Sequence, residues 1–60
     1  MLLEEYYAAV RRLGLKPTRV PHVYETAYGD VVSVPDGEKQ TPAQRRETIE
    51  FIKEILGISD

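Results

Sequence analysis

Residues 20–34 read VPHVYETAYGDVVSV and contain two β-rich runs on either side of Gly29. Valine, threonine and tyrosine recur in residues 20–26, and valine dominates residues 31–34. Both runs suit extended backbone, and a glycine between them is typical of a tight turn. The pattern predicts an antiparallel hairpin of two strands, at about 20–26 and 31–34. Pro21 is expected at an edge or a strand start, because proline has no amide hydrogen to donate.

The turn of this hairpin can be built in two ways. In the first, Tyr28 and Gly29 form a two-residue turn. In the second, a type I turn is followed by Gly29 as a bulge residue, so that Thr26 lies opposite Asp30. The second is favoured, because Tyr28 then need not adopt a positive φ. It gives one face of the hairpin to a set of five side chains, which are Val20, His22, Tyr24, Val32 and Val34.

The segment before the hairpin, residues 2–13, has the apolar spacing of an amphipathic helix. The side chains that share its apolar face are Leu2, Leu3, Tyr6, Tyr7, Val10 and Leu13. Gly14 is expected to cap this helix with a positive φ, and Leu15 to close back on the last turn. Pro17 then prevents the helix from resuming.

The segment after the hairpin predicts a second helix over residues 42–56. Thr41 is expected to cap its start, with Pro42 in the first turn and Gln44 completing a capping box. Gly57 is expected to end it with a positive φ. Its apolar face is broad and consists of Ile49, Phe51, Ile52, Ile55 and Leu56. Between hairpin and helix, residues 35–37 read PDG and predict a turn, followed by a polar loop at 38–40.

The order of these elements predicts an α+β fold in one small domain, residues 1–60, arranged helix–β-hairpin–helix (αββα). A lone hairpin is marginally stable in water, so both helices are expected to pack against one face of the two-stranded hairpin. A chain of 60 residues supports one small core and is marginally stable by itself.

Composition excludes several classes of function. Cysteine is absent and there is one histidine, so a disulfide, a thiolate metal site or a multi-histidine metal site cannot form within one chain. The four glycines are isolated, and no glycine-rich phosphate loop occurs. We therefore expect no catalytic activity and no cofactor, and we interpret His22 as a structural strand residue. No apolar run approaches the ~20 residues of a membrane span and no signal peptide is recognised, so we expect no membrane partner and a cytoplasmic location.

Basic residues raise one alternative function. Six of them could form a phosphate-binding face if the fold brings two groups together, and they are Arg11, Arg12, Lys16, Arg19, Arg45 and Arg46. The net charge is −2, and no aromatic residue is interleaved with the basic stretch. We therefore expect nucleic-acid binding to be weak at most. Helix-dipole matching and solvated helix faces explain the same charges without a ligand.

Tyrosine supplies four of the five aromatic residues, and it is well suited to interfaces because it combines apolar area with a hydroxyl. Tyr28 at the tip of the hairpin is not expected to reach the core. The candidate protein interface comprises Val23, Tyr24, Tyr28 and Val31. The sequence thus favours a protein–protein interaction module or accessory subunit, with either another protein or a second copy as partner. The free edge at residues 31–34 leaves a monomer and a homodimer both open.

Overall fold

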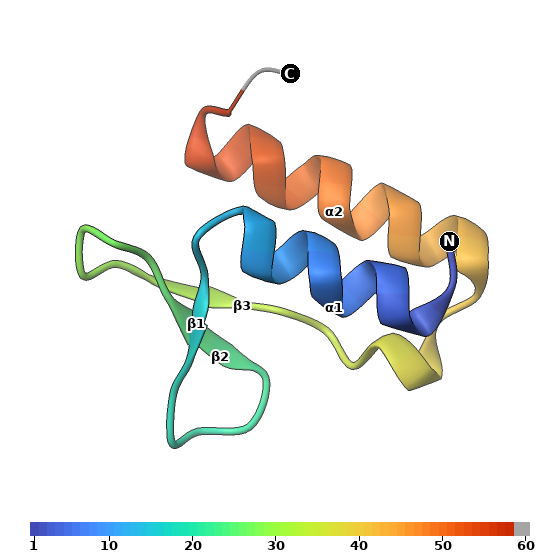
Figure 1. The fold of residues 1–60 in the computed structure, drawn as a ribbon, viewed down its shortest axis with the longest axis horizontal. Coiled ribbons are helices and arrows are strands. Elements are labelled where there is room, and N and C mark those ends of the chain that lie inside the picture. Colours follow the sequence, from blue (N-terminus) through green and yellow to red (C-terminus); the bar gives the residue numbers. More distant parts are fainter. Residues whose placement is uncertain (59–60) are drawn as a thin grey trace.

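The computed structural model describes residues 1–58. Its elements are α1 (Leu3–Arg12), β1 (Lys16–Pro17), β2 (Val23–Glu25), β3 (Val31–Ser33), the 3₁₀ helix η1 (Gly37–Lys39) and α2 (Pro42–Leu56). The strands form one antiparallel sheet in the order β1-β2-β3. The fold is therefore α+β, with two α-helices and a three-stranded sheet (Figure 1). Among the described residues, no helix has the length and apolarity needed to cross a membrane.

The predicted two-stranded hairpin is wrong in strand number. Lys16 pairs with Glu25, and Pro17 pairs with Tyr24, so the chain leaving α1 adds a third strand to the sheet. Thr18 holds this strand in place, because its amide and its hydroxyl both donate to one carbonyl of β2, at 3.1 and 2.8 Å. Two residues are too few to show an alternating pattern, and a proline argues against a strand, so no sequence pattern predicts β1.

The first predicted strand is also too long, because residues 20–23 form a turn. The Val23 amide donates to the Val20 carbonyl over 3.2 Å, and His22 has a φ of 64°. The fixed φ of Pro21 suits the second position of a type II turn, whose third residue takes a positive φ. Val20 and His22 are exposed, so they do not join the core face of the sheet.

The turn between β2 and β3 has the bulged form that the sequence favours. The Thr26 amide donates to the Asp30 carbonyl over 2.8 Å, and Gly29 has a φ of 87°. Tyr24 lies opposite Val32, as this register requires. The predicted register is therefore confirmed, and it directs Val32 towards the helices.

Both helices end at the glycine that their sequences predict. Gly14 and Gly57 have positive φ values of 82° and 71°. At the end of α2, the Ile58 amide donates to the Lys53 carbonyl over 3.0 Å, which is the outer bond of a Schellman motif. At its start, the capping box closes with two bonds between Thr41 and Gln44, at 3.2 and 2.9 Å. The polar loop expected after the PDG turn is instead the short helix η1, because the Asp36 side chain caps it.

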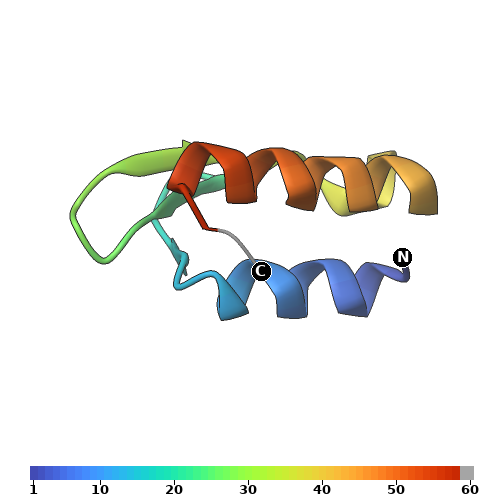
Figure 2. The same cartoon turned by 90° about the horizontal axis from the view of Figure 1, so that it is seen from above.

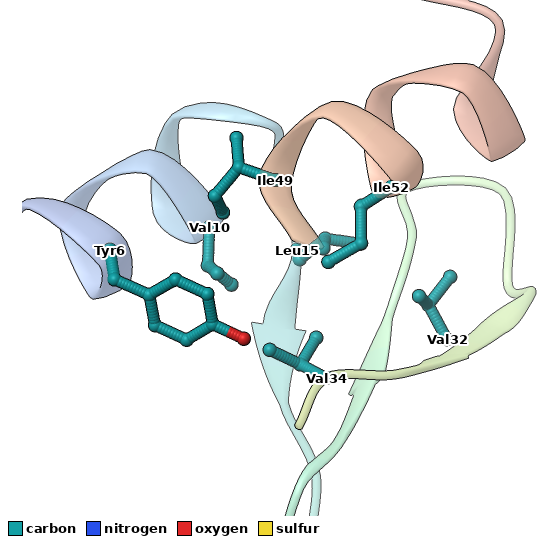
Figure 3. Packing of buried hydrophobic residues seen from close by; sticks show 7 residues of the cluster. All are labelled: Tyr6, Val10, Leu15, Val32, Val34, Ile49 and Ile52. Carbon is teal, nitrogen blue, oxygen red and sulfur yellow. The ribbon is translucent and has the colours of Figure 1, made fainter. Parts of the chain in front are cut away.

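The two α-helices lie side by side and run in the same direction (Figures 1 and 2). They can do so because residues 34–41 carry the chain back along α1 before α2 begins. Seven buried side chains from both helices, β3 and the flanking segments form the core, and they are Tyr6, Val10, Leu15, Val32, Val34, Ile49 and Ile52 (Figure 3). The core thus lies between the helix pair and one face of the sheet.

Tyr6 links this core to the returning segment. Its ring is fully buried, and its hydroxyl donates to the Pro35 carbonyl over 2.8 Å. The same hydroxyl accepts from the Gln40 side-chain amide over 3.3 Å. Gln40 in turn accepts a 2.6 Å bond from the Thr48 hydroxyl of α2. Burial raises the pKa of Tyr6 above its ordinary value of 10.0, and the hydrogen bond from Gln40 partly opposes this effect.

Gly37 is packed against α1 where no side chain fits. A Cβ atom there would lie 2.7 Å from the Leu3 Cδ1 atom and 2.8 Å from the Tyr6 Cδ2 atom. The Gly37 amide also donates to the Tyr7 hydroxyl over 3.2 Å, and the rings of Tyr6 and Tyr7 meet edge to face at 5.1 Å. The PDG turn is thus a docking point for α1 as well as a chain reversal.

Tyr6→Phe tests the buried hydroxyl. We expect the free energy of unfolding to fall by about 1 kcal/mol at neutral pH, because the variant loses a buried hydrogen bond. The pKa of Tyr6 is higher in the folded state than in the unfolded state. The stabilisation that the protonated hydroxyl contributes is therefore fully present below pH ~10 and is lost as the pH rises further. The stability difference between the two proteins should therefore shrink above that pH. Urea unfolding at neutral pH and in steps above ~10 measures both effects.

Tyr28→Phe is the control, because that side chain is almost fully exposed. It should leave stability unchanged at neutral pH. An equal loss in both variants would contradict the role given to Tyr6.

His22→Gly tests the strained turn. We expect the free energy of unfolding to rise by about 0.5–1 kcal/mol, because glycine adopts a positive φ without steric cost, and this gain exceeds its added entropy in the unfolded chain. Arg19→Gly in the same connection is the control. Its φ is not positive, so it should lose stability through the entropy term alone. Thermal unfolding of both variants decides the matter, and destabilisation by His22→Gly would show that the turn carries no strain.

Candidate interaction surface

The four residues of the predicted interface do not form one surface. Tyr24 is half-buried and packs against the core, on the face of the sheet that it shares with Val32. Val23 and Val31 precede these two residues, so they project from the opposite face, since side chains alternate along a strand. Tyr28 lies beyond both strands, at the tip of the β2–β3 turn, where it is 94% exposed. Tyr24 is thus part of the core edge, and Tyr28 and Val31 are the two strongly exposed members.

Two grooves follow the border between α2 and β3. The first, of about 730 Å³, lies between the ends of both helices and the β2–β3 turn. The second, of about 550 Å³, lies between α2 and residues 33–40. Ile55 lines both grooves, so the two grooves adjoin at this side chain on the flank of α2.

Most of the residues with exposed apolar side chains line these grooves, and Val31 does so at the edge of β3. Seven large apolar side chains are exposed in the described part of the chain. The five that line the grooves are Tyr28 (94% exposed), Val31 (68%), Phe51 (62%), Ile55 (56%) and Ile58 (39%). We call these five residues the α2–β3 surface. The remaining two, Leu2 and Val20, line neither groove. Clustering of this kind marks a binding surface rather than scattered apolar exposure.

The α2 part of this surface was not among the predicted interface residues, although the sequence contained a signal for it. At about 100° per residue, the apolar positions of α2 span roughly 160° of its circumference, from Ile49 to Phe51. One packing partner needs a narrower stripe. The structure divides this arc, because Ile49 and Ile52 enter the core whereas Phe51 and Ile55 stay exposed. The excess width of the apolar face was therefore the feature that pointed to a second contact.

The six predicted phosphate-binding residues are divided between the two ends of the molecule. Arg11 and Arg12 lie at the end of α1, followed by Lys16 and Arg19, whereas residues 45 and 46 lie near the start of α2. Because the helices run in the same direction, the start of α2 lies beside the start of α1, away from its end (Figures 1 and 2). The fold does not gather these charges into one cluster.

Among the six basic residues, Arg45 has a structural role. Its Nε atom donates to the Gly37 carbonyl over 2.8 Å, and its Nη1 atom donates to the Met1 carbonyl over 3.2 Å. The side chain is half-buried, whereas that of Arg46 is exposed. Arg45 thus joins η1, the N-terminus and α2, and its guanidinium is already directed at backbone carbonyls.

No protein-family model, curated protein or solved structure matches this chain. Within residues 1–58, no three metal-ligating side chains come together. His22, exposed in the β1–β2 connection, lines neither groove. The geometry therefore directs attention to the α2–β3 surface, whose chemistry is that of an apolar contact.

Arg45→Met and Arg46→Met separate the structural arginine from its neighbour. We expect Arg45→Met to lower the free energy of unfolding by about 1–2 kcal/mol, because two hydrogen bonds from a charged donor are lost while most of the stem is retained. Arg46→Met should change stability by less than about 0.5 kcal/mol. Chemical denaturation of both variants measures the difference, and equal effects would contradict the assignment.

Proposed function

We propose that this protein is a small non-catalytic module that binds another protein chain through the α2–β3 surface. The observation that carries the proposal is the gathering of five exposed apolar residues along two adjoining grooves, beside an edge strand of the sheet. A solvated surface gains nothing from this arrangement, because exposed apolar area costs free energy in water. Covering Phe51 and Ile55 with a partner would recover that cost.

The composition of the two grooves supports binding rather than chemistry. Their charged lining residues are Asp30, in one groove, and Lys39 and Glu47, in the other. No histidine of the described chain lines either groove, so the side chain that most often acts as a general acid or base is absent from both. A polar rim around an apolar centre is the usual anatomy of a protein interface.

The alternative, nucleic-acid binding, draws less support from the fold. It requires the basic residues to share a face, whereas they occupy two ends of the molecule and Arg45 is bonded to backbone carbonyls. The exposed arginines of α1 remain suited to the weak, non-specific attraction expected of any small basic patch.

Site-specific photocrosslinking tests the proposed function. A benzophenone amino acid replaces Phe51 in one protein and Val20 in a control, since both side chains are exposed to a similar extent. After irradiation in the natural host, the probe at position 51 should form protein adducts, because it lies inside the proposed contact. Adding Ile55→Lys to the same protein should remove them.

The control probe at position 20 should form few adducts. Equal labelling from both positions would show a non-specific apolar surface. An absence of any protein adduct at position 51, from a second copy or from another protein, would refute the binding role of the α2–β3 surface.

A further inference from the structure

The two edges of the sheet differ in what they offer to another strand. At the β1 edge, Lys16 lies opposite Glu25, and the Thr18 amide donates to the Val23 carbonyl. Pro17, between these contacts, therefore turns its backbone nitrogen away from β2, because backbone groups alternate along a strand. Proline has no amide hydrogen, so a strand approaching β1 finds no donor there. The β1 edge is closed to pairing.

The β3 edge is open. The Val34 amide donates to the His22 carbonyl over 2.7 Å, and the bulged turn makes the matching contact at the other end of the strand. Val32, halfway between them, therefore directs its backbone groups towards β2 as well. By the same alternation, Val31 and Ser33 direct their amides and carbonyls outwards, where an incoming strand can bind them.

We propose, building on the proposed binding role of the α2–β3 surface, that its partner is a second copy of this chain. The two copies pair antiparallel through β3, about a two-fold axis at Val32. In this register Val31 of one copy lies opposite Ser33 of the other, and each exchanges an amide and a carbonyl with its counterpart. The outward backbone groups of β3 are then all paired, and the two sheets join into one.

The flank of α2 explains why the partner is a whole copy rather than a single strand. An extended peptide can pair with β3, but it has no helix to cover the exposed rings and methyl groups of α2. A second copy brings the same apolar flank to the same place. Under the two-fold axis, the groove lined by Tyr28 and Ile58 faces the partner's groove lined by Phe51, and Ile55 lies in both grooves beside the junction. The surface is therefore complementary to itself.

Charge and edge protection favour a closed dimer over a longer assembly. Across the two-fold axis, the groove lined by Asp30 faces the partner's groove lined by Lys39 and Glu47, so charges of both signs meet there. Once β3 is paired, the remaining edges of the joined sheet are the two β1 strands, each protected by Pro17. Growth stops at two copies, because neither end accepts a further strand.

Sedimentation equilibrium of the full chain tests the proposal. Between ~10 µM and ~1 mM, the range in which small interfaces dissociate, the mean mass should rise from one chain towards two and then stop. Two changes address the two halves of the contact. Ile55→Lys charges the α2 flank, and N-methylation of the Ser33 amide, introduced by chemical synthesis, removes one outward donor. Each should weaken association by at least about tenfold, whereas Val20→Lys, at an equally exposed site, should leave it unchanged.

Amide hydrogen exchange adds a direct measurement of the strand pairing. The Val31 and Ser33 amides should exchange more slowly as protein concentration rises, and the Arg19 amide should not. N-methylation at Ser33 must leave the circular dichroism of the dilute chain unchanged, so that a lost dimer is not a lost fold.

Each other outcome overturns the inference in a recognisable way. A constant mass of one chain across the range excludes the second copy but leaves the photocrosslinking result, and with it the proposed function, standing. A dimer that survives both changes uses another surface. A dimer that survives N-methylation but not Ile55→Lys packs through helices without joining its sheets. A mass that grows beyond two chains excludes the closed two-fold arrangement.

Discussion

The hydrogen bond from the Tyr6 hydroxyl to the Pro35 carbonyl is the contact on which the rest of the structure depends. It joins the buried face of α1 to the segment that returns from the sheet. Gln40 extends it, donating to the same hydroxyl and the same carbonyl and accepting from Thr48 in α2. Within the described chain every buried side-chain nitrogen and oxygen has a partner. A network of this kind favours one arrangement of its elements, because displacing α1 leaves the hydroxyl of the buried Tyr6 without a partner.

This network also determines which side of α2 is exposed. Because residues 34–41 are held along α1, α2 must begin beside the N-terminus, where the Met1 ammonium donates to the Pro42 carbonyl over 3.3 Å. The helices then run in the same direction, and the Ile49 and Ile52 side chains meet the core. The remaining apolar arc of α2, with Phe51 and Ile55, borders the open edge of β3. The interaction surface is thus a consequence of the same constraint that orders the core.

In this chain, short sequence patterns predict the local structure, and the predictions that are wrong concern features that depend on tertiary contacts. Caps, turns and the hairpin register depend on a few neighbouring residues, and Gly14, Gly29 and Gly57 behave as their neighbours require. The third strand depends on Thr18 meeting a carbonyl beyond a turn, which no short pattern encodes. In the same way, Arg45 appears in the sequence as surface charge, and its bonds join residues 8 and 44 positions away. The sequence contains part of the evidence for the α2–β3 surface, because the apolar face of α2 is wider than a single packing partner needs.

The short length of the open edge distinguishes it from an aggregation hazard. A long apolar edge accepts many strands in many registers, whereas this one is bounded by the Gly29 turn before it and by Pro35 after it. Pro35 follows Ser33 at the next outward position, and it can offer no donor there. Only Val31 and Ser33 remain, and only the antiparallel register centred between them satisfies both. The apolar flank of α2 is buried in that register alone. The residues that provide the binding free energy therefore also select the register.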